Sequence, residues 1–524
     1  MKIVVAEKIA AAAMELLQSV PGCALITPEQ FAAAPAESMQ GADALIVRSA
    51  VQADAALIDR APELRVIGRA GVGVDNIDVE TATRRGIVVM NAPGASSTAV
   101  AELALGLMIA MARHIPKADH TTRAGRWEKK SLQGTELSGK TLGILGLGRI
   151  GTEVARRAQA FGMKVIGSDP YLAPARAKEL GIELIPADDV FARADYLSLH
   201  LALTHQTAGI INAERLAKMK AGARLINCAR GELVDEAAAA AALRSGHLGG
   251  AALDVFCEEP THNSALLEAP NLLATPHLGA STKEGQEAVG IQIARQVRDY
   301  LVRGIAQNAV NLPSLTDVEY KQISPYMDLA ARLGRFAAQL FNSNLSEIEV
   351  RYEGEVGQWK TDLIRASAVA AILSADADSD SQANLINAQS AAEEHGVVVR
   401  SSHVEPNARV SQLHLRLTGP TGAVECSGTL VHGTSPRLVQ LNGIDIESRL
   451  EGDFVVVANL DAPGVVGAIG THLGAHGINI ARLSLGREGR EALAIVEVDG
   501  VVSQDVLAGL RAAPSVHQVT SVRV

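Results

Sequence analysis

Residues 141–151 read TLGILGLGRIG, and the architecture of the chain around them can be predicted from this pattern. The aliphatic run at 141–145 indicates a buried β-strand, and residues 150–161 have the spacing of an amphipathic helix. Gly146 and Gly148 lie between the two, and Gly151 lies in the first turn of the helix. A strand, a glycine-rich turn and a helix in this order predict the first unit of an open parallel sheet.

Each of the three glycines has a physical task in a dinucleotide site. The first permits the tight turn, the second lets a pyrophosphate approach the backbone, and the third lets the helix pack close to the strand. A second strand, 164–168, ends at Asp169. That carboxylate would bind ribose hydroxyls and repel a 2′-phosphate, so NAD is favoured over NADP. A glycine turn without a ligand is the alternative, and the complete set of flanking elements favours NAD.

Strands and helices alternate on both sides of this stretch. Short aliphatic strands and helices fill residues 1–90, and further strands follow from 141 to 274. Long helices are predicted at 98–113 and 284–301. This alternation predicts an α/β fold with two parallel-sheet domains, Rossmann-like or flavodoxin-like.

The remainder of the chain has a different pattern. Gly304 and the residues 311–313 mark a boundary, and residues 314–451 read as an α+β domain without a cluster of catalytic residue types. Residues 452–524 follow the order β-α-β-β-α-β, which is the ferredoxin-like arrangement.

Length and composition exclude several classes of protein. A chain of 524 residues with 48% apolar residues is too long for one core and predicts several domains. A net charge of −10 without a basic stripe argues against nucleic-acid binding. The four cysteines lie far apart, so we expect reduced thiols and no metal site. No apolar run approaches the ~20 residues of a membrane span and no signal peptide is evident, so we expect a cytoplasmic protein.

Three segments at the ends of successive strands carry an arginine, two carboxylates and a histidine. Arg230 follows the strand 224–227, Asp254 lies in the strand 251–255 and Glu259 follows it, and His277 follows the strand 272–274. Ligands bind at the carboxyl ends of parallel strands, so these side chains are expected to converge. Histidine is the natural base for a hydroxyl proton, a carboxylate orients its ring, and an arginine holds an anionic substrate. Asp254 would hold the nicotinamide carboxamide or tune the site. Singly, each residue reads more readily as an ordinary loop residue, and their joint placement at successive strand ends favours the functional interpretation.

The segments 142–151, 227–231, 253–260 and 275–282 together resemble the D-2-hydroxyacid dehydrogenase family. Within that family the likeness is to the branch that oxidises D-3-phosphoglycerate with NAD, and residues 69–78 resemble its substrate loop. The long form of that branch carries an intervening domain and a C-terminal ACT domain, which 314–451 and 452–524 resemble. The resemblance also implies a discontinuous substrate domain, 1–98 plus 283–312, and an NAD domain, 99–282.

The resemblance assigns roles to individual residues. Arg230, Glu259 and His277 would be catalytic. The implied cofactor contacts are Gly146, Gly148, Arg149, Ile150, Gly151, Asp169, Thr204, Cys228, Ala229, Arg230, Asp254, His277, Gly279 and Ala280. The implied substrate contacts are Arg48, the backbone of Val72 and Gly73, and Arg230, with Lys129 or Lys130 adding charge across a subunit boundary. The chain departs from the family at 200–202, which lacks a frequent proline, and at Ser96, where asparagine is frequent.

For the tail, the resemblance implies a homotetramer that binds L-serine between paired ACT domains. Asn459, Asp461 and Asn479 would hold the amino acid, and an oligomerisation domain without a ligand is the alternative. Two other functions remain open at this point. One is another 2-hydroxyacid dehydrogenase, acting on glyoxylate, hydroxypyruvate or D-lactate. The other is an NAD-sensing corepressor that keeps the same fold and the same three catalytic residue types.

Overall fold

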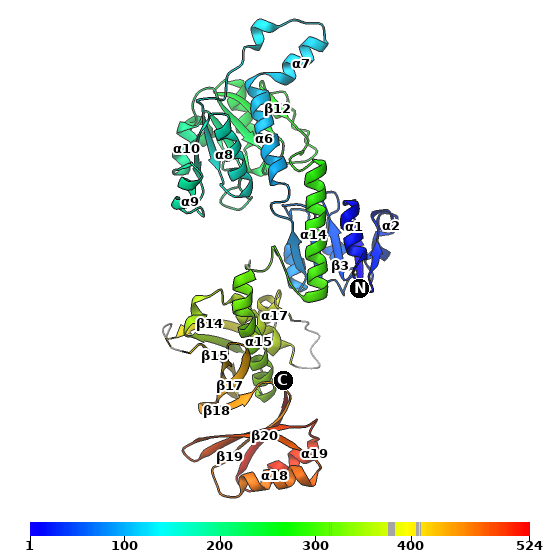
Figure 1. Ribbon diagram of the computed structural model, residues 1–524, viewed down its shortest axis with the longest axis vertical. Coiled ribbons are helices and arrows are strands. Elements are labelled where there is room, and N and C mark those ends of the chain that lie inside the picture. Colours follow the sequence, from blue (N-terminus) through cyan, green and yellow to red (C-terminus); the bar gives the residue numbers. More distant parts are fainter. Residues whose placement is uncertain (314, 316, 376–382, 405–407, 409) are drawn as a thin grey trace.

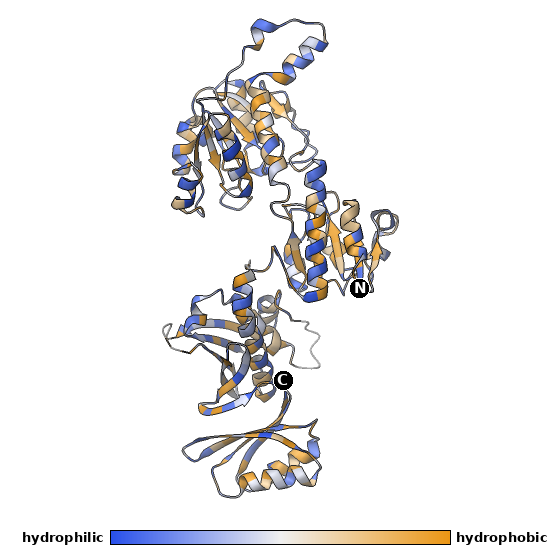
Figure 2. Cartoon of the chain, in the orientation of Figure 1, coloured by the Kyte–Doolittle hydropathy of each residue, from blue (hydrophilic) through white to orange (hydrophobic). Residues whose placement is uncertain are grey.

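The computed structural model describes residues 1–313, 315, 317–375, 383–404, 408 and 410–524. They form four separate β-sheets in an elongated molecule, in which the second sheet along the chain lies at one end, followed in space by the first, the third and the fourth (Figure 1). The strands of the two N-terminal sheets are mostly hydrophobic, as buried parallel strands should be (Figure 2). The expected start of the third domain, residue 314, lies outside the described residues.

The first sheet has five parallel strands in the order β2-β1-β3-β4-β5, a flavodoxin-like order. Its strands are β1 (Lys2–Val5), β2 (Ala24–Ile26), β3 (Ala44–Val47), β4 (Val66–Arg69) and β5 (Val88–Asn91). Its helices are α1 (Ala11–Gln18), α2 (Pro28–Ala33), α3 (Pro35–Met39), α4 (Ala55–Ile58) and α5 (Val79–Arg84). The distant helix α14 (Lys283–Arg303) packs against α1 and β4, and Ile293 and Val297 are fully buried in this core.

The second sheet has seven parallel strands in the order β12-β11-β10-β9-β6-β7-β8, which places the topological switch point between β6 and β9. The strands are β6 (Thr141–Leu145), β7 (Lys164–Ser168), β8 (Glu183–Leu184), β9 (Tyr196–Leu199), β10 (Ala223–Asn227), β11 (Leu248–Leu253) and β12 (Leu272–Ala274). Flanking them are α6 (Ser97–Ala112), α8 (Arg149–Ala160), α9 (Pro174–Glu179), α10 (Ala187–Arg193), α11 (Ala213–Lys218), η2 (Gly231–Leu233), α12 (Glu236–Arg244) and α13 (Ser264–Leu267). Between α6 and β6 an arm with α7 (Ile115–Arg123) and η1 (Lys129–Leu132) projects from the body (Figure 1).

The third sheet is mixed, with the order β14-β13-β15-β16-β17-β18. Its strands are β13 (Glu347–Glu353), β14 (Val398–Val404), β15 (Gln412–Gly419), β16 (Gly422–Val431), β17 (Ser435–Leu441) and β18 (Ile444–Arg449). The helices are α15 (Asp317–Leu340), η3 (Glu355–Gln358), α16 (Asp362–Leu373) and α17 (Ala388–Glu394). The helix expected at 328–340 is longer than predicted and contains Pro325.

The fourth sheet has the order β20-β21-β19-β22, as in the ferredoxin-like fold. It consists of β19 (Asp453–Leu460), β20 (Ile480–Glu488), β21 (Glu491–Val498) and β22 (Val516–Arg523), with helices α18 (Val465–Ala475) and α19 (Gln504–Arg511). One face of β19 packs on the third domain, where the rings of Phe336 and Phe454 meet edge to face at 6.3 Å.

The predicted fold class is confirmed: two parallel-sheet α/β domains precede a mixed α+β domain and a β-α-β-β-α-β tail. Among the described residues, no single helix has the length and apolar content to cross a membrane; α6 and α7 reach that length together only across a 61° bend.

Candidate active site

A cleft of about 1540 Å³ lies where the first and second sheets face each other. The predicted residues that line it are Arg48, Val72, Gly73, Ile150, Cys228, Ala229, Arg230, Glu259, His277, Gly279 and Ala280. The other predicted cofactor residues do not line it: Gly146, Gly148, Arg149, Gly151, Asp169, Thr204 and Asp254. The cleft therefore gathers most of the expected substrate and catalytic residues, while the glycine-rich turn lies outside its lining.

The glycine-rich turn has the geometry that a pyrophosphate requires. Gly146 has φ +89°, and a Cβ there would lie 2.4 Å from the His200 carbonyl oxygen. A Cβ at Gly151 would lie 2.1 Å from the Gly146 carbonyl oxygen, whereas one at Gly148 would meet open space. The turn is thus closed on the protein side and open at Gly148, which caps helix α8. Free N–H groups at this helix start are suited to a phosphate, so the residues present fit NAD.

Asp169 closes the turn from the end of β7. Its Oδ2 accepts the Leu147 N–H at 2.7 Å and its Oδ1 accepts the Tyr171 N–H at 2.8 Å. These bonds fix the carboxylate beside the glycine-rich turn, where a ribose would lie. Thr204 is exposed in the loop after β9, and its hydroxyl pairs with that of Thr207 at 3.0 Å.

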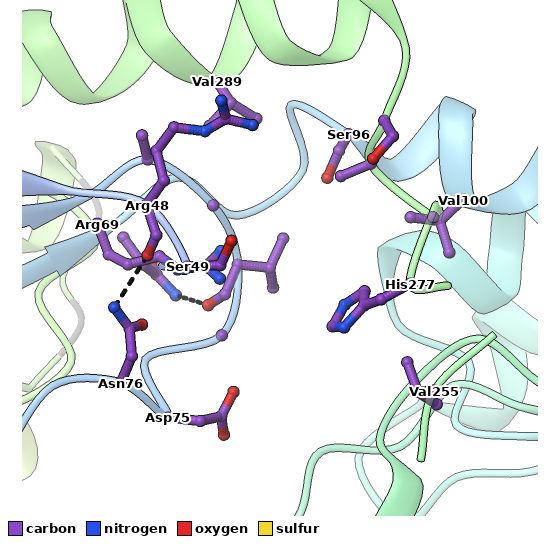
Figure 3. A pocket seen from close by; sticks show the side chains of 18 of the residues that line it. Arg48, Ser49, Arg69, Asp75, Asn76, Ser96, Val100, Val255, His277 and Val289 are labelled. Atoms are coloured by element: carbon purple, nitrogen blue, oxygen red, sulfur yellow. Dashed lines mark hydrogen bonds between the residues drawn. The ribbon is translucent and has the colours of Figure 1, made fainter. Parts of the chain in front are cut away.

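His277 and Glu259 form a pair at the edge of the second sheet. The distance between His277 Nδ1 and Glu259 Oε2 is 2.7 Å, and Glu259 Oε1 accepts the Phe256 N–H at 3.0 Å. The carboxylate is therefore held by the backbone and in turn holds the ring. Figure 3 shows His277 directed across the cleft toward the loop that carries Arg69 and Asp75.

Asp254 positions the turn on which His277 stands. Its side chain is fully buried, and it accepts the Thr275 hydroxyl at 2.6 Å and the N–H groups of Leu278 and Gly279 at 2.8 Å. His277 adopts the left-handed conformation, φ 53°, which these bonds stabilise. The two roles expected for Asp254, a bond to the nicotinamide carboxamide and tuning of the site, both stay predictions.

Arg230 reaches across the cleft from the end of β10. Its Nε donates to Asp75 Oδ2 at 3.1 Å, and its Nη1 donates to the Ala229 carbonyl oxygen at 2.6 Å. The fully buried Asn227, which sequence reasoning missed, accepts the Ala229 N–H at 3.0 Å and donates to the Arg230 carbonyl oxygen at 2.7 Å. The neighbouring Cys228 is buried, and burial raises the pKa of its thiol, so it stays protonated.

A third arginine, Arg69, was also missed by sequence reasoning. It ends β4 and lines the cleft with Arg48 and Arg230, so the rule of functional residues at strand ends would have found it. Its Nε is enclosed without a hydrogen-bond partner among the described residues. Burial lowers the pKa of Arg69, and the charge of Arg230 lowers it further. Three guanidinium groups at one cleft form a site for an anion with more than one negative group.

His200 is a further cleft residue without a predicted role. Its Nε2 lies 2.8 Å from the Ser198 hydroxyl, and its Nδ1 is enclosed without a partner among the described residues. Burial lowers the pKa of His200 to about 4, so the ring is neutral at pH 7. The other position that departs from the family, Ser96, is buried beside the cleft.

The three expected effector residues do not meet within one chain. Asn459 pairs with Ala492 near one end of the fourth sheet, and Asp461 directly follows that end of β19. Asn479 directly precedes Ile480, which pairs with Val498 at the opposite end. In the described structure Asn479 donates to Asp499 at 2.7 Å, and Oδ1 of the buried Asn459 has no partner among the described residues. Any site that uses all three side chains therefore requires two chains.

Comparison with known proteins gives matches over nearly the whole chain. The NAD-binding domain of D-isomer specific 2-hydroxyacid dehydrogenases matches residues 105–279, and the D-3-phosphoglycerate dehydrogenase intervening domain matches residues 322–442. The D-3-phosphoglycerate dehydrogenase of Methanocaldococcus jannaschii is 39% identical, and the match covers 93% of each chain. That of Mycobacterium tuberculosis is 42% identical over 91% of each chain. The crystal structure of D-lactate dehydrogenase from Aquifex aeolicus, complexed with NAD and lactic acid, is 27% identical, with a TM-score of 0.53 over 60% of this chain and 100% of that one.

Proposed function

The chain belongs to the D-3-phosphoglycerate dehydrogenases, a branch of the D-isomer specific 2-hydroxyacid dehydrogenases, and we propose that it oxidises D-3-phosphoglycerate to 3-phosphohydroxypyruvate with NAD. This reaction is the first step of L-serine biosynthesis. The observation that carries the proposal is the His277–Glu259 pair at 2.7 Å, which lines the same cleft as Arg48, Arg69 and Arg230. A base and three cations in one cleft match an alcohol that carries a carboxylate and a phosphate.

The chemistry follows from what each side chain can do. NAD, when bound, accepts the hydride from C2 of the substrate. His277 takes the C2 hydroxyl proton on Nε2, because Nδ1 already faces Glu259. Glu259 keeps the ring oriented and stabilises the imidazolium that forms. Arg230 holds the substrate carboxylate and polarises the oxygen, and the backbone N–H groups of Val72 and Gly73 bind the same carboxylate.

The phosphate has its own pair of cations in this proposal. Arg48 and Arg69 lie on the first-sheet side of the cleft, away from His277 (Figure 3). Arg69 is half-buried and its Nε is already enclosed, so a charge-assisted bond from a phosphate to this side chain displaces less water than one to a fully exposed arginine. Lys129 and Lys130 do not line the cleft of their own chain, so their expected contribution requires the arm of a second chain.

We also propose the assembly and its regulation. The projecting arm carries Trp127, which is 84% exposed, and supplies a surface for pairing two nucleotide-binding domains. Because the three effector residues lie at opposite ends of one tail, pairing of two tails brings them together and creates an L-serine site. Two kinds of pairing per chain give a homotetramer. We assign 1–98 plus 283–312 to the substrate domain and 99–282 to the NAD domain, and we place the protein in the cytoplasm.

The test is the absorbance of NADH during turnover of 3-phosphoglycerate. We expect His277→Ala to lower turnover by about two to four orders of magnitude, because the acid/base group is lost, while NAD affinity is largely kept. His517→Ala is a matched control, because His517 is similarly exposed, 49% against 51%, and lies 3.7 Å from Glu491, outside the cleft. Near-normal turnover of His277→Ala would remove this residue from the mechanism.

The substrate is tested on the wild-type chain. We expect 3-phosphoglycerate to be turned over faster than D-glycerate or D-lactate at equal concentration, since only the phosphorylated acid engages all three arginines. Faster turnover of an unphosphorylated acid would assign the chain to another 2-hydroxy acid. Binding of NADH without turnover of any of these acids would favour the corepressor.

A further inference from the structure

The contact between Asp75 and Arg230 joins the two sides of the cleft and has no part in the reaction as proposed above. Arg230 follows β10 of the second sheet, whereas Asp75 lies in the loop after β4 of the first sheet. Their side chains meet at 3.1 Å between Nε and Oδ2. Arg230 is 26% exposed and Asp75 is 63% exposed, so the pair lies at the solvent side of the cleft.

The donors of Arg230 show which part of the guanidinium the contact occupies. Nη1 is directed to its own backbone, at the Ala229 carbonyl oxygen. Nε and Nη2 form the side of a guanidinium that grips a carboxylate with two parallel bonds. That side faces the loop 72–75: a Cβ at Gly73 would lie 1.9 Å from Nη2 and 2.5 Å from Asp75 Oδ2. Asp75 therefore occupies one of the two donors that a substrate carboxylate needs.

We propose that Asp75 is a positioning residue that stands in for the substrate carboxylate, holding Arg230 across the cleft until an anion displaces it. The inference rests on the proposed function only in taking Arg230 as the carboxylate clamp. The contact also requires Gly73, because a side chain at this position would prevent the Arg230 guanidinium from lying against the loop.

The positive charges around Arg230 give the Asp75 carboxylate an electrostatic role. Arg48 and Arg69 line the same cleft, and the pKa of Arg69 is lowered first by burial and then by Arg230, while Asp75 acts in the opposite direction. Before an anion arrives, Asp75 offsets part of this repulsion. When the anion arrives, Asp75 becomes a like charge and a competitor for Nε.

The competition predicts a particular kinetic signature. Exposed ion pairs are weak, so the stand-in is displaced easily and its removal has a modest effect. Substrate, transition state and product all carry the carboxylate, so loss of Asp75 strengthens the binding of all three. Such uniform binding lowers KM and leaves kcat nearly unchanged.

The experiment compares Asp75→Asn, Asp75→Glu and the wild type in two measurements. The first is KM and kcat for 3-phosphoglycerate, and the second is the Kd of oxalate for the NADH-loaded full chain by calorimetry. We expect Asp75→Asn to lower both KM and Kd by about two- to fivefold, with kcat within about twofold, and the difference to shrink at high salt. Asp75→Glu keeps the charge and should stay near the wild type.

Asp59→Asn is the matched control, because Asp59 is 62% exposed and pairs with Arg85 in the same domain at 2.6 Å, away from the cleft. It should change neither constant. An unchanged or raised Kd and KM in Asp75→Asn would overturn the proposal, as would a large fall in kcat, which would mean that Asp75 orients Arg230 for the reaction. The oxalate measurement needs no turnover, so a wild type inactive on 3-phosphoglycerate would refute the proposed substrate alone. A wild type that binds no oxalate would refute the clamp and the stand-in together.

Discussion

Among the single residues, His200 leads to a testable prediction about how the free energy of unfolding depends on pH. Burial lowers its pKa to about 4, below the ordinary value of about 6.5, so as the pH falls the unfolded chain binds the proton first. The neutral ring makes its whole contribution to the free energy of unfolding above pH 6.5, and this contribution is lost as the pH falls from 6.5 to 4. Between pH 7 and 5 we expect the wild type to lose about 2 kcal/mol that His200→Gln does not lose, measured by urea unfolding of the nucleotide-binding domain. An equal loss in both proteins would contradict this account.

At the scale of elements, the close approach of β6 and α8 controls the nucleotide turn. A Cβ at Gly151 would lie 2.1 Å from the Gly146 carbonyl oxygen, which is backbone and cannot move aside cheaply. We expect Gly151→Ala to displace the start of α8 and to raise the Kd for NADH at least about tenfold, measured by fluorescence titration. Gly106→Ala in α6 is the control, because its added Cβ meets nothing within 4 Å and should leave the Kd unchanged. Unchanged affinity in Gly151→Ala would show that the turn tolerates a wider spacing.

In the whole molecule, the L-serine site proposed for the tail requires two chains. Asp461 and Asn479 lie at opposite ends of one fourth sheet, so an L-serine site built from both needs two chains. We expect Asp461→Ala and Asn479→Ala each to abolish the effect of millimolar L-serine on turnover. Mixed oligomers of the two variants should regain part of it, since one of the two sites in a mixed pair has both residues intact. Failure of the mixture to respond, with subunit exchange verified by mass spectrometry, would place the site elsewhere or leave the tail as an oligomerisation domain.

The fold class and the chemistry expected at the strand ends could be predicted from the amino-acid sequence. Period and composition are local properties, so TLGILGLGRIG and its flanks predicted the parallel sheet, and Arg230, Glu259 and His277 could be named from their places after strands. The three-dimensional structure adds three facts that the sequence did not supply. His277 Nδ1 lies 2.7 Å from Glu259 Oε2, Arg69 is a third cation of the cleft, and Asp75 contacts Arg230. His277 and Glu259 lie 18 positions apart in loops of the same sheet, whereas Asp75 and Arg230 lie 155 positions apart and follow strands of two different sheets. The contact between Asp75 and Arg230 depends on how the two sheets face each other, which no local pattern encodes.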